Sequence, residues 1–261
     1  MNTNNKLITA LIQADLMWEN PPENRKKFEE KINTLSSNID IVILPEMFTT
    51  GFTMNATNLA ETINGPTVIW MQKLAVQKKC AFVGSIIITE NNQYFNRLLF
   101  VHPSGKIDFY DKKNLFTLAG EHKVFSAGNK KTIINYKGWK ICPSICYDLR
   151  FPVWARNTEN YDLLLYVASW PVNRIEAWDT LLKARAIENM SYTIGVNRVG
   201  QDANNYEYNG NSVGYDPLGK CLAKNDKGEE TCLIIELNKE VQNKIRDKFK
   251  FLDDKDIFNI Q

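Results

Sequence analysis

The chain has 261 residues, enough for one large α/β domain, and its 32 Lys and Arg nearly balance its 30 Asp and Glu. Such a balance, without a dense basic cluster, argues against nucleic acid or a membrane surface as a partner. The first six residues lack the basic-then-apolar layout of a signal peptide, and no apolar stretch approaches the length needed to cross a bilayer. We therefore expect a cytoplasmic protein.

Five cysteines and two histidines limit the chemistry that this chain can support. An odd number of cysteines does not form a disulfide framework, and their spacing contains no CxxC pair. With so few histidines, the sequence offers no metal-ligand cluster. We therefore expect reduced cysteines, and neither a metal nor a cofactor.

Apolar runs and helical patterns alternate along the chain. Short β-branched runs predict buried strands, at residues 7–12, 39–44, 81–88, 97–102, 132–136, 139–145, 163–168 and 192–197. Helical patterns lie between several of them, at residues 23–35, 66–79, 152–158 and 176–190. Turn sequences at 102–106 and 216–220 predict hairpins. The alternation predicts an α/β fold of mixed sheets covered by helices, and the lack of a linker predicts one domain over residues 1–261.

A carboxylate, an ammonium and a thiol each follow an apolar run closely. They belong to Glu46, Lys112 and Cys146. In open α/β sheets the chemistry gathers at the carboxyl ends of the strands, so all three side chains would reach one crevice. A thiol reacts as its thiolate and therefore needs a base or a positive neighbour. Together these residues predict a nucleophilic hydrolase that needs no histidine.

Cys146 is a better candidate for the nucleophile than Cys142, which lies four residues earlier in the same run. Inside a predicted strand, Cys142 fits an inert buried thiol. Cys146 ends that strand before a helix-like segment, whose N–H groups favour a thiolate and would supply half of an oxyanion hole through the Tyr147 amide. Three other cysteines lie in strand-like runs and are expected in the core, Cys80, Cys221 and Cys232.

We expect Glu46 to act as the general base, because desolvation at the end of an apolar strand suits a carboxylate to proton transfer. His102 lies in a predicted hairpin turn and His122 in a loop, so both fit a surface position better. Lys112 would stabilise the oxyanion formed when an amide carbonyl is attacked. Lys113 competes with it for that position. Solvated surface charges remain the alternative interpretation of these groups.

Three segments resemble the signatures of the carbon–nitrogen hydrolase (nitrilase-like) superfamily. They are residues 44–48, 110–116 and 145–152, in that order along the chain. The resemblance covers nearly the whole sequence. It implies an αββα sandwich fold, and members of the family commonly form dimers.

The same resemblance implies a Glu–Lys–Cys triad, with Glu46, Lys112 and Cys146 at the matching positions. The family's second glutamate near the site matches Glu121. Asn114 departs from the pattern, since this branch often has His two residues after the lysine. That departure leaves the triad itself untouched.

The segments 170–174 and 178–182 resemble the bacterial ω-amidase branch, whose enzymes hydrolyse the terminal carboxamide of 2-oxo acids such as 2-oxoglutaramate and 2-oxosuccinamate. Such a substrate needs a cation for its far carboxylate, and Arg174 is our candidate, with a surface salt bridge as the alternative. Three aromatic residues would form apolar walls unless they are plain core, Phe48, Phe116 and Trp170.

Other activities remain open at this point. Within the family, the chain would also fit an amidase of simple aliphatic amides or an N-carbamoyl amidohydrolase. Outside it, a thiol sensor or a non-catalytic binding module would also use a reactive cysteine. The segment from about residue 249 to 256 mixes aromatic and charged side chains. We expect a C-terminal tail there, either frayed or packed against the second subunit of a homodimer.

Overall fold

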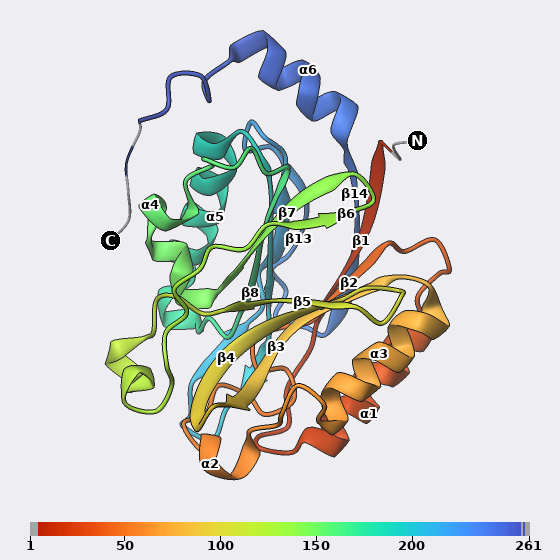
Figure 1. Ribbon diagram of the computed structural model, residues 1–261, viewed down its shortest axis with the longest axis vertical. Coiled ribbons are helices and arrows are strands. Elements are labelled where there is room, and N and C mark those ends of the chain that lie inside the picture. Colours follow the sequence, from red (N-terminus) through yellow and green to blue (C-terminus); the bar gives the residue numbers. More distant parts are fainter. Residues whose placement is uncertain (1–4, 257, 259–261) are drawn as a thin grey trace.

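Two facing β-sheets with helices on their outer sides make up the molecule, as the computed structural model in Figure 1 shows. The structure describes residues 5–256 and residue 258. Within these residues, the two large sheets have six strands each, and a short ribbon joins β10 (Val199–Gln201) to β11 (Glu207–Asn209). The expected αββα sandwich of two mixed sheets is confirmed.

The first sheet carries the N-terminal half of the chain and one late strand. Its order is β14 (Thr231–Asn238), β1 (Lys6–Gln13), β2 (Ile41–Ile43), β3 (Ala81–Glu90), β4 (Gln93–Val101) and β5 (Ile107–Asp111). β1, β2 and β3 run parallel, and the outer pairings are antiparallel. The fully buried sequence of β2 reflects this central position, because a parallel strand is covered on both faces.

The second sheet repeats this arrangement with the later part of the chain. Its order is β13 (Cys221–Asn225), β12 (Ser212–Tyr215), β9 (Tyr192–Asn197), β8 (Leu163–Ala168), β7 (Trp139–Ile145) and β6 (Ile134–Tyr136). β7, β8 and β9 run parallel, with antiparallel strands on either side. Every residue of β8 is buried, as its unbroken apolar sequence predicts.

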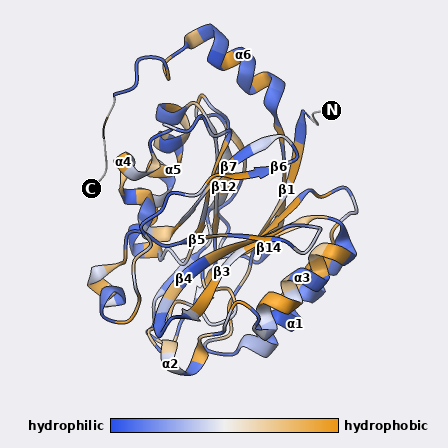
Figure 2. Ribbon diagram, viewed as in Figure 1, coloured by the Kyte–Doolittle hydropathy of each residue, from blue (hydrophilic) through white to orange (hydrophobic). Residues whose placement is uncertain are grey.

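The helices cover the outer face of each sheet and leave one apolar core between the sheets. α1 (Pro21–Asn33) and α3 (Pro66–Lys78) pack on the first sheet, and α4 (Pro152–Ala155) and α5 (Ile175–Asn189) on the second. α2 (Ala56–Leu59) is a single turn, and α6 (Lys239–Phe249) follows β14. Figure 2 shows hydrophobic residues concentrated along the strands, while α6 is largely hydrophilic. No helix among the described residues is long and apolar enough to cross a membrane.

The predicted elements are present in the structure, but one predicted helix is shorter than expected, and α2, β10 and β11 had not been expected. All eight predicted strands and all four predicted helices are present, and both hairpins form. The predicted helix 152–158 ends at Ala155, because Arg156 already has an extended backbone. β14 and α6 were not predicted. α6 did carry a signal, since Asn238 caps it by accepting a hydrogen bond from the Val241 N–H.

Candidate active site

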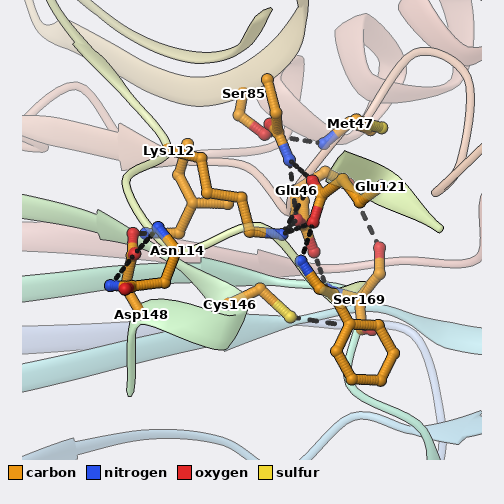
Figure 3. Close-up of polar contacts among 12 residues, drawn as sticks. Glu46, Met47, Ser85, Lys112, Asn114, Glu121, Cys146, Asp148 and Ser169 are labelled. Atoms are coloured by element: carbon orange, nitrogen blue, oxygen red, sulfur yellow. Dashed lines mark hydrogen bonds and ion pairs between the residues drawn. The ribbon is translucent and has the colours of Figure 1, made fainter. Parts of the chain in front are cut away.

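Lys112 lies between two glutamates at the centre of a buried polar cluster (Figure 3). Its Nζ is 2.9 Å from Glu46 Oε1, and 3.0 and 2.9 Å from the two carboxylate oxygens of Glu121. Lys112 follows β5, Glu46 follows β2, and Glu121 begins a short 3-10 helix. All three side chains are at most 1% exposed. Separate elements therefore bring one ammonium and two carboxylates together out of water.

The charges in this cluster favour a protonated lysine. Burial alone lowers the pKa of an ammonium, but the carboxylates of Glu121 and Glu46 outweigh it and hold the pKa of Lys112 above its ordinary value. The cluster thus keeps a fixed positive charge next to the cavity. Lys113, by contrast, points away and lies 5.5 Å above the ring of Trp154. The alternation along the chain therefore brings Lys112, and not Lys113, into the cluster.

Cys146 occupies a sharp turn directly after β7. Its φ of 45° lies in the left-handed region, which a residue with a side chain rarely adopts, and it is the first residue of the 3-10 helix Cys146–Arg150. Its Sγ lies 3.9 Å from the Ser169 carbonyl oxygen, at the end of the neighbouring strand β8 (Figure 3). The strained backbone thus holds the thiol in a fixed position at the carboxyl ends of the parallel strands.

The thiol of Cys146 is protonated at neutral pH. Burial raises its pKa well above the ordinary value, the Glu46 carboxylate raises it further, and Lys112 opposes both effects. Both charged groups are therefore near enough to act on the sulfur. A thiol of this kind becomes a nucleophile only when a base removes its proton.

Asp148 fixes the turn that carries Cys146. Its carboxylate accepts hydrogen bonds from the Ile145 N–H at 3.0 Å, from the Tyr110 hydroxyl at 2.8 Å, and from the backbone and side-chain N–H groups of Asn114 at 2.9 Å. Asn114 therefore ties the segment after Lys112 to the turn at Cys146. This contact gives a physical role to the one residue that departs from the family pattern.

A cavity of about 510 Å³ opens onto Glu46, Lys112 and Cys146. Phe116, Trp170 and Arg174 line it, as does Tyr147. Arg150 also lines the cavity. The guanidinium of Arg174 lies 5.2 Å from the Phe116 ring, and that of Arg150 lies 5.0 Å from the Trp170 ring. Among the described residues, neither guanidinium pairs with a carboxylate.

Phe48 does not line this cavity, and the expectation that it forms a wall is wrong for the described structure. It is 0% exposed and packs edge-on against Phe28, with 5.4 Å between the ring centroids, in the core under α1 and α3. The backbone turns at Met47, whose φ is 44°. The Glu46 side chain therefore faces the cavity, whereas Phe48 packs in the core under α1 and α3. Phe52 lines the cavity instead, with its ring 5.1 Å from the ammonium of Lys112.

The other candidate groups lie elsewhere. His102 is hydrogen-bonded to Asp108 at 2.7 Å and His122 is exposed, and neither is among the described residues that line the cavity. Cys80 is buried as expected, but Cys221 is exposed, so its predicted place in the core is wrong. β13 lies at the edge of its sheet, which leaves this side chain uncovered. No group of three or more potential metal ligands exists within residues 5–256 and 258.

Several residues of the site carried no recognisable sequence signal. The Ser169 N–H donates to Glu46 Oε2 at 2.9 Å, and the Asn96 side chain donates to Glu46 Oε1 at 2.8 Å. Asp202 and Tyr208, joined by a 2.8 Å hydrogen bond, also line the cavity, as does Trp18. A backbone N–H has no residue-type signature. The two wall residues act through tertiary contacts that a short motif does not encode.

Comparisons with known proteins agree with this geometry. Residues 8–246 match the family model described as carbon-nitrogen hydrolase. The chain is 42% identical over 251 residues to the omega-amidase YafV of Yersinia enterocolitica, covering 95% of this chain and 96% of that protein. It is 33% identical over 260 residues to the 2-oxoglutaramate amidase of Bacillus subtilis, covering 97% and 100%.

Solved structures give the same answer for the fold. XC1258 from Xanthomonas campestris, a CN-hydrolase superfamily protein with an arsenic adduct in its active site, superposes with a TM-score of 0.95 at 38% sequence identity. The match covers 98% of this chain and 99% of that one. The chain belongs to the carbon-nitrogen hydrolase family.

Proposed function

We propose that the protein is an ω-amidase, which hydrolyses the terminal carboxamide of small 2-oxo acid ω-amides such as 2-oxoglutaramate and 2-oxosuccinamate to the dicarboxylate and ammonia. The observation that carries the proposal is a buried thiol, carboxylate and ammonium facing a cavity that also holds two guanidinium groups, neither of which pairs with a carboxylate of residues 5–256 or 258. The omega-amidase and 2-oxoglutaramate amidase among its relatives support this choice of substrate.

The first half of the proposed reaction forms a thioester. Glu46 removes the proton of the Cys146 thiol, and the sulfur attacks the carboxamide carbon. Lys112 and the backbone N–H of Tyr147 stabilise the oxyanion, since a fixed positive charge is most effective in a site shielded from water. Glu46 then gives its proton to the leaving nitrogen, and ammonia departs.

The second half hydrolyses the thioester with a water molecule. Glu46 and Glu121 are the two candidates for the base. Each oxygen of Glu121 already binds two donors, Lys112 and Asn96 at Oε1, and Lys112 and the Phe116 N–H (2.6 Å) at Oε2. Within the described residues, Glu46 Oε2 binds one donor, the Ser169 N–H, and Glu46 also lines the cavity. We therefore assign the base role to Glu46 in both halves. Glu121 fixes the position of Lys112 and of the wall that begins at Phe116.

The cations of the cavity explain a preference for substrates with a far carboxylate. Arg174, with Arg150 beside it in the same lining, offers planar N–H donors that suit a carboxylate. Phe116 and Trp170 support these guanidinium groups through contacts of about 5 Å with their ring faces. Asp202 also lines the cavity, but its oxygens accept hydrogen bonds from the Tyr208 hydroxyl and from the Asn204 and Tyr206 N–H groups.

A substrate panel tests the proposal. Ammonia release would be measured from 2-oxoglutaramate, 2-oxosuccinamate, a simple aliphatic amide and an N-carbamoyl amino acid, with the Cys146→Ala protein as the control. We expect the two 2-oxo amides to give the highest kcat/KM and Cys146→Ala to release no ammonia. Equal rates for the aliphatic amide, or faster release from the N-carbamoyl compound, would contradict the substrate assignment. Substantial turnover by Cys146→Ala would contradict the mechanism.

The environment of Cys146 favours an enzyme over a thiol sensor. Sensor cysteines have a low pKa and are accessible to solvent. Burial instead raises the pKa of Cys146, and the adjacent carboxylate raises it further. A sensor role also gives no reason for Glu46 and Lys112 to lie beside the sulfur.

We further propose that residues 1–261 form one catalytic domain that works as a cytoplasmic homodimer. The family match over residues 8–246 and five unpaired cysteines support the domain and the compartment. The outer side of the second sheet exposes apolar side chains of Val153, Ile187 and Leu218, which a second copy would cover. Beyond the end of α6, Phe251 is 55% exposed and stacks on Phe249.

The dimer is tested by the mass in solution of the full chain and of a chain that ends at Phe249. We expect a dimer that shifts toward monomer on truncation, because the segment from about residue 249 would lose its contacts with the partner. Residues 257 and 259–261 of that segment lie outside the described residues. A monomeric full chain would rule out the dimer, and an unchanged mass after truncation would rule out the role of the segment.

A further inference from the structure

Asn96 lies between the two carboxylates of the site. It belongs to β4 and is 0% exposed. Its Nδ2 donates to Glu46 Oε1 at 2.8 Å and lies 3.4 Å from Glu121 Oε1. Its backbone carbonyl also accepts a hydrogen bond from the Lys112 N–H at 3.0 Å. One asparagine thus contacts both carboxylates through its side chain and the backbone of Lys112 through its carbonyl.

The Asn96 amide has a single acceptable orientation. A flip would turn the Oδ1 atom toward two carboxylates, which repel it, so the Nδ2 atom must face them. In this orientation Oδ1 is buried and has no hydrogen-bond partner within the described part of the chain. A buried acceptor without a partner is destabilising. The unpaired Oδ1 is a cost of this orientation, which the charge-assisted hydrogen bond from Nδ2 to Glu46 offsets, so the placement of Asn96 points to a role in the site.

The two oxygens of Glu46 differ in how many donors they bind. Oε1 accepts from both Lys112 and Asn96, whereas among the described residues Oε2 accepts only from the Ser169 N–H. We infer that Asn96 is a positioning residue, which holds Oε1 and thereby leaves Oε2 as the atom of Glu46 that takes the proton from Cys146. The inference deepens the proposed function and rests on the base role assigned there to Glu46.

Ser169 connects the base to the nucleophile. Its N–H donates to Glu46 Oε2, and its carbonyl oxygen lies 3.9 Å from the sulfur of Cys146 (Figure 3). In the proposed step the S–H bond breaks, the proton moves to Oε2, and the electron pair left on sulfur forms the bond to the substrate carbon. The charged or titratable groups that face Glu46 are Lys112, Glu121 and Cys146.

Two variants of Asn96 test this assignment. Asn96→Leu keeps the size of the side chain and removes its donor, and Asn96→Asp keeps the shape but adds a negative charge. Both changes remove the hydrogen bond that Asn96 donates to Glu46 Oε1, and the added charge of Asn96→Asp also repels that carboxylate, so proton transfer from Cys146 becomes less favourable. We expect the rate at which Cys146 reacts at neutral pH to fall by about 10- to 100-fold. We also expect the acidic inflection in the pH profile of Cys146 reactivity to move to higher pH in Asn96→Leu, and further in Asn96→Asp.

The measurement is the pH dependence of alkylation of Cys146 by iodoacetamide, followed by peptide mass analysis so that Cys221 and Cys232 do not contribute. This readout needs no substrate. It therefore tests the pair of base and thiol even if the 2-oxo amides prove to be the wrong substrates. The kcat/KM profile for 2-oxoglutaramate gives a second, independent curve.

Asn157→Leu is the matched control. Asn157 is also buried and makes three side-chain hydrogen bonds, to Tyr161 and Asn189, but it lies outside the lining of the cavity. We expect it to lower thermal stability without moving the alkylation profile. An unmoved inflection in both Asn96 variants would overturn the inference. A shift of the same size in Asn157→Leu would overturn it as well.

Discussion

Strand β8 has a charged cluster at each end. Asp162 precedes its first residue and accepts hydrogen bonds from the Lys140 N–H at 2.8 Å and from Lys239 at 2.8 Å, with Arg246 at 3.4 Å. Ser169 follows its last residue, and its N–H binds Glu46. Both clusters are largely buried and contain the same kinds of residue.

The two clusters differ in whether a carboxylate oxygen can accept a further hydrogen bond and in whether a cavity lies beside it. At the start of β8 the basic residues come from α6, and Gln242 also donates to the Asp162 carbonyl at 2.7 Å, so that cluster fastens the helix to the sheet. At the end of β8, Glu46 Oε2 keeps room for another hydrogen bond, and a cavity and a thiol lie beside it. Buried charge alone therefore does not mark a site. An unfilled acceptor next to a nucleophile and a cavity does.

Among variants of the two clusters, Glu46→Gln should give the largest loss of activity. The change keeps the shape of the side chain but removes the base, so we expect ammonia release to fall by roughly 10³-fold. One carboxylate remains for Lys112, so the folded state should hold its stability. Initial rates and thermal unfolding of the same preparation check both points. Normal turnover by this variant, or its failure to fold, would contradict the catalytic role assigned to the cluster at the end of β8.

Asp162→Ala should have the opposite profile. Removing the carboxylate leaves Lys239 and Arg246 without their shared partner, so the free energy of unfolding should fall by roughly 3 kcal/mol. The kcat of the folded protein should not change, because α6 lies away from the cavity lining. Urea unfolding together with the ammonia assay measures this. Asp162→Asn still accepts a hydrogen bond, so its free energy of unfolding should fall less than that of Asp162→Ala. A loss of kcat without a loss of stability would contradict the structural role of Asp162.

Arg174→Ala should affect binding rather than chemistry. We expect KM for 2-oxoglutaramate to rise by about 10- to 100-fold, because a bidentate carboxylate contact is lost, with little change for a neutral amide. Arg174→Lys keeps the charge but not the planar donors, so its KM for 2-oxoglutaramate should lie between those of the unchanged protein and of Arg174→Ala. The same increase for the neutral amide would show that Arg174 shapes the cavity instead of binding a carboxylate.

Cys142 lies between the two ends, paired with Leu164 of β8, and should give the smallest effect. Burial raises the pKa of its thiol to about 12 in the folded protein, from an ordinary value of about 9. The thiol contributes its full stability below about pH 9, and that contribution falls as the pH rises toward 12, by up to about 1.4 kcal/mol per pH unit. Cys142→Ala should flatten this alkaline loss in urea unfolding series. An equal slope in both proteins would contradict it.

The sequence allowed the fold and the centre of the site to be predicted because their signals are local. Apolar runs identified the parallel strands, and Glu46, Lys112 and Cys146 follow those strands or the hairpin beside them. The start of α6 was also readable from Asn238, although it was overlooked. Strand ends and caps depend on neighbouring residues, so a single sequence can reveal them.

The remaining parts of the site depend on contacts between distant segments. Phe48 was assigned to the wrong side of the sheet, because the left-handed turn at Met47 is not visible in a motif. Asn96 is 50 residues from Glu46, and Ser169 is 123 residues from it and acts through its backbone. Such contacts exist only once both sheets have packed.

The trio of Glu46, Glu121 and Lys112 has a consequence for the end of each catalytic cycle. Two negative charges around one positive charge leave a net charge of −1 beside the cavity. A neutral carboxamide enters this field without penalty, but the acid made from it acquires a new negative group at the same spot. Like charges at short range repel each other, so the new carboxylate weakens the binding that Arg174 gives to the far carboxylate of the product, and inhibition by accumulated product should be weak.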